Sequence, residues 1–454
     1  GDTSRATVTV EVTPASTTNT YANGYGYRRR IVLPAPTADQ MTVNDTVVLF
    51  AEEADWLRTV ANGGKVASPE GADLRFELTD GGKLDHEIEH YDPLAGKLIA
   101  WIRLPNWTLS SQLQLIVYYG NPATAGSEAS PEGVWQGYLA RWRLPSGVDA
   151  TGRGRDLAAS NVLPGQLLGS AASLDGTGRL SLADTSWLDG LSTLTVQALV
   201  KPDATMVGSS VRILAQGGAA AAAGITLGYA AETGTGATNV VYAAVGSTDG
   251  EAATFSRADR QTSDRQLIHA RWQSSDAPQL YLNGSRATSS SSQPRSGVTQ
   301  SIDGPLEVGR DWVGLIDEVR ITDRVLPAAW IAAEAHNMLA PELSYGLGQE
   351  ETTASAAPSV VAVPFNVDVE AGKWIDVDVL AQIFAPATGE SATIVSVGQP
   401  SNGSVTVIGS AVRYAPASDF IGKDQFTYTI GNGETQSIGL IAVTVVDPAS
   451  QGQS

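Results

Sequence analysis

Short runs in which apolar and polar residues alternate recur along this chain, and they constrain the fold more than any other feature. Clear examples are residues 6–12 (ATVTVEV), 113–119 (LQLIVYY), 193–200 (TLTVQALV) and 441–446 (IAVTVV). A period of two with many Thr, Val, Ile and Tyr residues is typical of strands with one buried face. The only convincing helical segment is the short, alanine-rich stretch at 327–335 (PAAWIAAEA). We therefore predict an all-β fold.

Two polar segments divide the chain. Residues 120–132 (GNPATAGSEASPE) and 349–358 (QEETTASAAP) are small and polar, as linkers are. A chain of 454 residues is also too long for one core. We predict tandem β-sandwiches: an N-terminal strand in 1–20, domains at 21–128 and 129–350, a linker at 351–358, a domain at 359–448 and a tail at 449–454.

Composition excludes several classes of protein. The absence of cysteine excludes disulfides and thiol nucleophiles, and it fits an exported bacterial chain. No run approaches the ~18 apolar residues that a membrane helix needs, so no membrane insertion is expected. The net charge of −19, from 48 acidic and 29 basic residues, argues against nucleic-acid binding. The chain begins without a basic and apolar leader, so we expect that any signal peptide is already removed.

The first domain carries four segments in a specific order. They are residues 25–33 (YGYRRRIVL), 71–76 (GADLRF), 99–105 (IAWIRLP) and 115–122 (LIVYYGNP). This series resembles an uncharacterised bacterial surface domain. The function of that family is not established, so the resemblance implies a β-domain and no activity.

The second domain contains residues 149–156 (DATGRGRD), 174–180 (LDGTGRL), 194–202 (LTVQALVKP), 280–284 (LYLNG) and 315–321 (LIDEVRI). These segments resemble a laminin-G-like, concanavalin A-like jelly roll. Asn283-Gly284 suits the two-residue type I′ turn of a hairpin. The resemblance implies a domain that binds glycans or proteins.

The third domain contains residues 399–407 (QPSNGSVTV), 412–416 (VRYAP) and 420–430 (FIGKDQFTYTI). These segments resemble a bacterial Ig-like, cadherin-like adhesin repeat. The acidic cluster that such repeats carry is replaced here by residues 382–387 (QIFAPA), so we predict no calcium in this domain. We interpret the domain as a solvated spacer.

The jelly-roll resemblance implies one structural calcium ion, held by loop carboxylates. The matching acidic positions are Asp149, Asp156, Asp175 and Asp317, with Glu318 beside the last. Hard oxygen ligands of this kind suit calcium. Arg153 and Arg155 place positive charge in the same loop and oppose the ion. Calcium is the one cofactor we predict.

Residues 86–90 (HEIEH) satisfy the spacing of a zinc metalloprotease motif. That motif works only on a helix, where His86 and His90 would share a face. The segment lies between Gly81-Gly82 and Asp92-Pro93, a context that predicts a strand. The two histidines of a strand would lie about 13 Å apart, so we predict no zinc site.

We find no constellation for catalysis. The chain lacks a nucleophile elbow, and His269 and His336 lie apart in sequence, with His269 expected in the core or at a strand edge. Asp317 and Glu318 are adjacent, so on a regular strand they would point to opposite faces and could not flank one glycosidic bond. We predict that the protein is not an enzyme.

Tryptophan is the most promising residue type for ligand contact. Trp101, Trp142 and Trp272 fall in alternating strands, where burial is expected. Five others flank polar or glycine-rich loops and are expected at the surface: Trp56, Trp107, Trp187, Trp312 and Trp374. We predict Trp187 and Trp312 as ligand-binding residues.

Three functions remain open. The chain is a secreted or cell-surface adhesin segment that binds a glycan or protein, a structural subunit of a filament, sheath or phage fibre, or an accessory region of a polysaccharide-degrading enzyme. The strand at 6–12 either pairs with its own chain or completes a sheet in a neighbouring copy. In the second case the chain would assemble with copies of itself.

Overall fold

The computed structural model describes residues 20–36, 40–124, 126–206, 211–217, 224–230, 240–256, 262–300, 304–355, 358–386 and 391–447. The predicted strand at 6–12 and the predicted tail at 449–454 lie outside the described residues. The described part consists of β-sheets with two helices, α1 (Pro131–Trp135) and α2 (Ala328–Leu339). The prediction of an all-β fold is confirmed, and the predicted helix continues four residues further than expected. Neither helix is long and apolar enough to cross a membrane.

The first block contains two antiparallel sheets. One has four strands in the order β24 (Gly346–Leu347), β1 (Tyr27–Leu33), β6 (Leu113–Tyr119) and β3 (Arg75–Leu78). The other has three strands in the order β2 (Thr42–Glu53), β5 (Lys97–Thr108) and β4 (His86–Asp92). Two short 3₁₀ turns, η1 (Asp55–Leu57) and η2 (Val60–Asn62), connect β2 to β3.

The jelly roll also contains two sheets. Its nine-stranded sheet has a main path in the order β10 (Leu163–Gln166), β11 (Ser170–Asp175), β23 (Val313–Thr322), β13 (Thr193–Pro202), β18 (Gln266–Gln273), β19 (Gln279–Leu282) and β20 (Ser285–Arg286). Two further strands extend it: β7 (Ala140–Arg143) pairs with β23, and β8 (Val148–Asp149) pairs with β7. Its eight-stranded sheet comprises β21 (Ser289–Gln293), β17 (Gly250–Ser256), β16 (Val240–Ser247), β15 (Thr226–Ala230), β14 (Val211–Gln216), β22 (Leu306–Val308), β12 (Arg179–Leu182) and β9 (Ala158–Ser160). The short turns are η3 (Ser186–Leu188), η4 (Ala204–Met206) and η6 (Pro341–Leu343).

The Ig block has two smaller sheets. One has the order β25 (Phe365–Glu370), β31 (Gln436–Val446), β30 (Gly422–Gly431) and β27 (Thr393–Val397). The other has the order β26 (Ile375–Val377), β29 (Ala411–Pro416) and β28 (Gly403–Ile408). Between them lies a separate apolar core that includes Tyr414, Tyr428 and Val443.

The three-stranded sheet of the first block is buried on both faces. Along β2, Val48 and Phe50 belong to the core shared with the four-stranded sheet. Val47 and Leu49 belong to a second apolar cluster, which contains Leu199 of the jelly roll. Successive strand residues point to opposite faces, so one strand serves two cores. The three-stranded sheet therefore lies between the core of the first block and a cluster to which α1, α2 and the jelly roll contribute.

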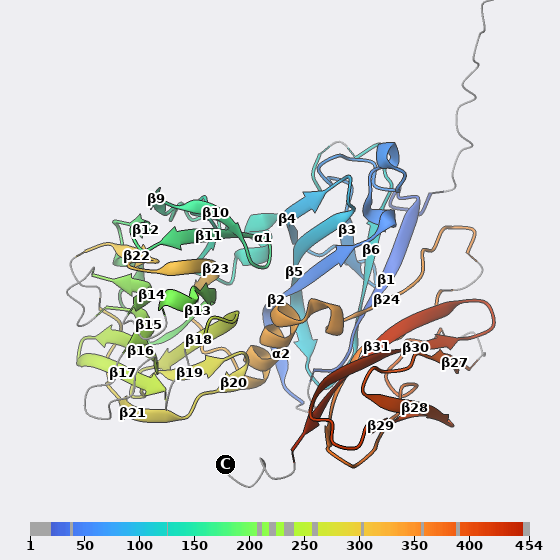
Figure 1. Cartoon of the computed structure of the whole chain (residues 1–454). Coiled ribbons are helices and arrows are strands. Elements are labelled where there is room, and N and C mark those ends of the chain that lie inside the picture. The colour runs from blue at the N-terminus through green and yellow to red at the C-terminus, as the bar shows by residue number, and fades with distance from the viewer. Residues whose placement is uncertain are drawn as a thin grey trace, which may run out of the picture.

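Helix α2 and the chain that follows it connect all three blocks. Trp330 and Ile331 pack in the core of the first block, and Ala335 and Met338 pack in the cluster shared with the jelly roll. After the helix, β24 pairs with β1 in the first block. Figure 1 shows α2 at the centre of the molecule, with the jelly roll, the first block and the Ig block around it.

Candidate functional site

The four residues predicted to hold calcium do not come together. Asp149 accepts hydrogen bonds from the Thr151 backbone (3.0 Å) and from the Arg155 backbone (3.2 Å), and Asp156 accepts one from the Asp149 backbone (2.8 Å). Both carboxylates therefore accept hydrogen bonds from backbone groups of their own loop, residues 149–156. Asp175 caps a tight turn elsewhere, and Asp317 is buried in β23. The residues present do not fit one calcium ion.

Asp317 instead belongs to another acidic group. Its carboxylate lies within 4.8 Å of those of Glu89 and Glu318, a group of three that crosses from the first block to the jelly roll. The expectation that Asp317 and Glu318 point to opposite faces is wrong. The pairing of β13 with β23 shifts register here, and Glu318 takes a φ of 50°. This bulge turns both carboxyl groups to one face of the sheet.

Arginines occupy the space between these acids. Arg141 donates to Glu89 (2.8 Å) and Glu318 (2.7 Å), and Arg320 donates to Glu318 (2.5 Å) and Glu334 (2.8 Å). Glu334 also accepts from His269 Nε2 at 3.1 Å. All these side chains are almost fully buried. Arg141 lies among these acids, so a cation at this position would meet its guanidinium group.

The network contains a surplus of acid. Glu87 joins it through Arg141 and Arg143, which gives five carboxyl groups and three guanidinium groups in contact. Burial, and then Glu318, raises the pKa of Glu89 to about 7. Burial, and then Glu318 and Glu89, raises the pKa of Asp317 well above its ordinary value. Both shifts favour the protonated form of these acids, and Arg141 joins β4 of the first block to β23 of the jelly roll.

Neither histidine of the HEIEH segment belongs to a group of three or more potential metal-ligating side chains among the described residues. The segment lies on β4, so the predicted strand is confirmed. His86 is fully buried, and its ring meets that of Phe76 at 5.1 Å. Burial lowers the pKa of His86 to about 4. His269, expected in the core or at a strand edge, is likewise fully buried.

The predicted tryptophans behave differently from one another. Trp312 is 0% exposed, so the expectation of a surface ring is wrong. It follows a turn, but its ring points inward and stacks on Tyr229 at 6.0 Å. Trp187 is half-buried, with the Arg155 guanidinium 4.2 Å above its ring. Trp56 and Trp107 are also buried, whereas Trp374 is 56% exposed.

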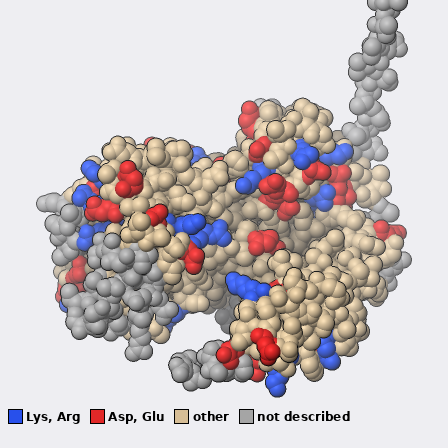
Figure 2. All heavy atoms as spheres, viewed as in Figure 1, with Lys and Arg blue, Asp and Glu red and all other residues tan. Residues whose placement is uncertain are grey.

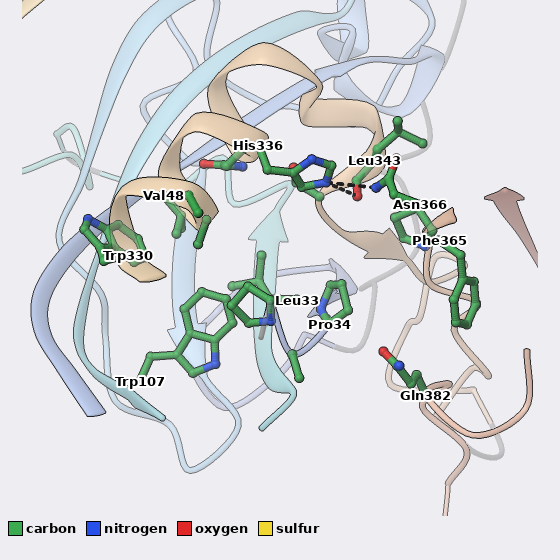
Figure 3. Close-up of a pocket in the computed structure, with 17 residues that line it drawn as sticks. Leu33, Pro34, Val48, Trp107, Trp330, His336, Leu343, Phe365, Asn366 and Gln382 are labelled. Atoms are coloured by element: carbon green, nitrogen blue, oxygen red, sulfur yellow. Dashed lines mark hydrogen bonds between the residues drawn. The ribbon is translucent and has the colours of Figure 1, made fainter. Parts of the chain in front are cut away.

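A cavity of about 350 Å³ lies where the three blocks meet (Figure 3). Its walls come from α2, from the end of β1, from β5 and from the Ig block. The residues that matter below are Trp107, Trp330, His336, Phe365, Asn366 and Gln382. None of its lining residues is Asp, Glu, Lys or Arg, although 17% of the chain is charged. We call this cavity the junction pocket.

The apolar wall of the junction pocket is rigid. Trp107 and Trp330 meet edge to face at 6.5 Å and are only 6% and 2% exposed. The indole nitrogen of Trp107 donates to the Ser111 carbonyl at 2.9 Å, which fixes the ring. Figure 3 shows Phe365 on the opposite side, brought in by the Ig block. An apolar wall fixed in this way needs no rearrangement to receive a ligand.

Only some of the polar side chains in the junction pocket are held by hydrogen bonds to other described residues. His336 Nε2 lies 2.9 Å from the Leu343 carbonyl and 3.2 Å from the Asn366 amide nitrogen. When Nε2 carries the proton it donates to Leu343, and the Asn366 amide is then not held by the ring. The side-chain amide of Gln382 makes no hydrogen bond within the described residues. Two neutral amides therefore remain for a ligand.

Sequence reasoning found only part of this pocket. It picked out Trp107 as a tryptophan near a loop, but it gave His336, Asn366 and Gln382 no binding role. These residues come from three blocks and from distant parts of the sequence. No spacing pattern can bring such residues together before the blocks are packed.

Three family models match separate parts of the chain. Residues 70–138 match a domain of unknown function (DUF2341), residues 174–332 match the concanavalin A-like lectin/glucanases superfamily, and residues 355–444 match a bacterial Ig domain. The three predicted resemblances are confirmed at this level. The first match begins after Tyr25 and the three arginines, so that part of the predicted signature lies outside it. No curated protein matches the chain.

Solved structures resemble the chain only distantly. Domain 4 of AbnA, an arabinanase of Geobacillus stearothermophilus solved with arabinotriose, is 18% identical, with 44% of this chain and 98% of that one covered and a TM-score of 0.33. The binding domain of Paraclostridial Mosquitocidal Protein 1 is 10% identical, with 67% and 91% covered and a TM-score of 0.37. The binding domain of botulinum neurotoxin DC, solved with rat synaptotagmin II, is 9% identical, with 68% and 74% covered and a TM-score of 0.35. These TM-scores are too low to support a statement about function.

Proposed function

We propose that this chain is a non-catalytic, ligand-binding segment of a secreted or surface-attached bacterial protein, an adhesin or fibre segment. Two matches support the proposal, because lectin-like and bacterial Ig domains are types typical of extracellular proteins. The largest acidic group of the described residues is enclosed in ion pairs and does not line the junction pocket. Nothing in that group is placed to act on a ligand in the pocket.

The ligand we propose for the junction pocket is a neutral carbohydrate. The observation that carries this proposal is an uncharged cavity that combines aromatic rings with amides not held by other groups. The C–H faces of a sugar ring pack on aromatic side chains, and its hydroxyl groups exchange hydrogen bonds with neutral amides. A charged ligand would enter this pocket without a counter-charge, which is costly.

The Ig block therefore does more than separate domains. It supplies Phe365, Asn366 and Gln382 to the junction pocket. Gln382 is also tied to the first block, because its carbonyl accepts from Gln112 Nε2 at 2.7 Å. The pocket is complete only when the Ig block is in place.

A glycan array probed with the full chain tests the proposal, followed by calorimetric titration of any neutral glycan that binds. In the double variant Asn366→Ala/Gln382→Ala we expect affinity to fall ~10-fold or more. The matched control is Asn44→Ala/Gln436→Ala, which removes one exposed asparagine and one exposed glutamine outside the pocket. The control should bind normally. Binding of no neutral glycan, or equal losses in the two variants, would reject the pocket as the site.

A further inference from the structure

A second cavity, of about 470 Å³, opens beside Pro364, which also lines the junction pocket. It lies between the first block and the Ig block. Its walls are the end of β2, the segment from Glu342 to Leu347, and the start of β31. We call it the seam groove. Its chemistry is unlike that of the neutral junction pocket.

The floor of the seam groove is apolar and partly open to solvent. Tyr345, Leu347, Ile438 and Leu440 line it. Ile438 is 68% exposed, among the largest values for an apolar side chain in the described residues. Exposed Ile side chains are common singly, but here the residue joins other apolar groups in a concave surface. Such a surface favours burial by a partner.

The rim of the seam groove is acidic. Glu52, Glu53 and Glu342 line the cavity, and no Lys or Arg does. The Tyr345 hydroxyl lies 2.5 Å from the Ala51 carbonyl, which takes its only proton, and 3.3 Å from Glu52. Burial raises the pKa of Glu52. No ion pair reaches any of these three glutamates among the described side chains. Arg29 is near enough to act on the charge of Glu52, but neither it nor any other Lys or Arg lines the groove.

The acidic lining continues along the same seam. A neighbouring cavity of about 320 Å³ is lined by Glu350, Glu351 and Glu434, again without Lys or Arg. Glu351 forms an ion pair with Arg28 at 2.9 Å, so its charge is already balanced within the protein. Among the described residues, Glu350 accepts a hydrogen bond from the Tyr119 hydroxyl at 2.9 Å and forms no ion pair. Glutamates thus line both cavities, and Glu351 is the one among them that forms an ion pair within the described residues.

We propose that the seam groove binds a basic, amphipathic peptide segment of another protein. Lysine or arginine side chains would pair with the glutamates of the rim, and apolar side chains would cover Ile438 and the floor. Charge complementarity of this kind steers a partner and fixes its register. This interaction surface is separate from the carbohydrate site proposed above, so either proposal can fail alone.

A second copy of this chain does not fit the seam groove. The net charge of −19 makes two copies repel. The one basic run, Arg28 to Arg30, is already engaged: Arg28 pairs with Glu351, Arg29 donates to the Gly348 carbonyl (2.9 Å), and Arg30 donates to Gln114 (3.0 Å). The occupant is therefore a different, cationic chain.

The test measures binding of a labelled synthetic peptide of alternating lysine and valine to the full chain by fluorescence anisotropy. We expect binding to weaken ~10-fold or more in Glu53→Gln/Glu342→Gln and several-fold in Ile438→Ser. The charge-matched control is Glu70→Gln/Glu370→Gln, two exposed glutamates outside the seam. This control should bind as the wild type does.

Three results would overturn the proposal. Equal weakening in the two double variants would mean attraction by net charge alone. Equal binding of a peptide of alternating lysine and serine would mean that the apolar floor plays no part. Displacement of the peptide by spermine at equal concentration would assign the groove to small polyamines and not to a protein segment.

Discussion

The first block has one interface with the jelly roll and another with the Ig block. The two interfaces differ in how completely their side chains are packed and paired. Toward the jelly roll it presents Val47, Leu49 and Trp101 to an apolar cluster that includes Leu199 and Leu267. The ion pairs of Arg141 and Arg320 lie in the same region, where both guanidinium groups stack on Trp135. This interface is built like the inside of one domain.

The interface toward the Ig block is smaller and more open. Its apolar contact is the cluster of Val32, Val361 and Val363. Arg30 lies 4.2 Å from the centre of the Phe384 ring, and Pro364 lines both the junction pocket and the seam groove. Acidic and basic side chains are interspersed over the face shown in Figure 2. The comparison teaches that ligand sites arise where packing between blocks is incomplete.

Cutting the chain should separate the two interfaces most clearly. A fragment of residues 359–447 keeps its own core, so we expect it to fold alone. A fragment of residues 129–350 would expose Leu199, Trp135 and the buried charges, and we expect it to aggregate or remain unfolded. Size-exclusion chromatography and circular dichroism check both outcomes. A monomeric 129–350 fragment with a cooperative melt would contradict the view that this interface is a shared core.

Breaking one buried ion pair should have the next largest effect. Arg320→Ala leaves Glu318 with only Arg141 and Glu334 with only His269 as a buried partner, and we expect it to destabilise the chain by about 3–5 kcal/mol. The control is Arg413→Ala, which removes an exposed pair with Asp376 in the Ig block and should destabilise the chain far less. Urea denaturation of both variants gives the comparison. Similar losses would show that the network is not special.

Much of the fold could be predicted from the sequence, because local patterns determine it. The Asn283-Gly284 turn is an example: both residues take positive φ, 49° and 85°, as a type I′ hairpin requires. The unbroken apolar run at 98–102 (LIAWI) is a further local pattern, which the search for alternating residues missed. Continuous apolar residues in a strand indicate burial on both faces, as β5 shows.

What could not be predicted depends on contacts between distant residues. The bulge at Glu318 reverses the expected alternation, and only the register with β13 reveals it. Trp312 follows a turn, yet its ring turns inward onto Tyr229. The junction pocket needs three blocks at once. Patterns along the chain identify strands and domains, whereas sites between blocks require their packing.

The surplus of acid at the jelly-roll interface predicts a pH dependence of intermediate size. The folded chain keeps a proton on Glu89 up to about pH 7, whereas the unfolded chain releases it near its ordinary pKa of 4.5. Glu89 therefore contributes a free energy of unfolding that falls as pH rises through this window, and Asp317 adds to the fall. His86 acts in the opposite direction up to its ordinary pKa of 6.5, because burial lowers its pKa to about 4.

Glu89→Gln tests this assignment. It should flatten the pH dependence and make the chain more stable above pH 7, by up to about 3 kcal/mol. Urea denaturation between about pH 5 and about pH 8 measures the effect. The exposed Glu70→Gln serves as control and should leave the profile unchanged. A pH dependence that is the same in Glu89→Gln as in the wild type would rule out a raised pKa at Glu89.

The smallest effect should come from the Ig interface. Val363 is fully buried in the cluster with Val32 and Val361, and Val363→Ala removes two carbon atoms from it, about 1–2 kcal/mol of packing. Because few other contacts hold this interface, we expect the Ig block to separate more often while remaining folded. Small-angle scattering should then give a larger radius of gyration. The same change in the core of the Ig block, Val445→Ala, should lower the melting temperature of that block without expanding the chain. If Val363→Ala leaves the radius unchanged and Val445→Ala increases it, the Ig block is held more firmly than its contacts indicate, and the contrast between the two interfaces fails.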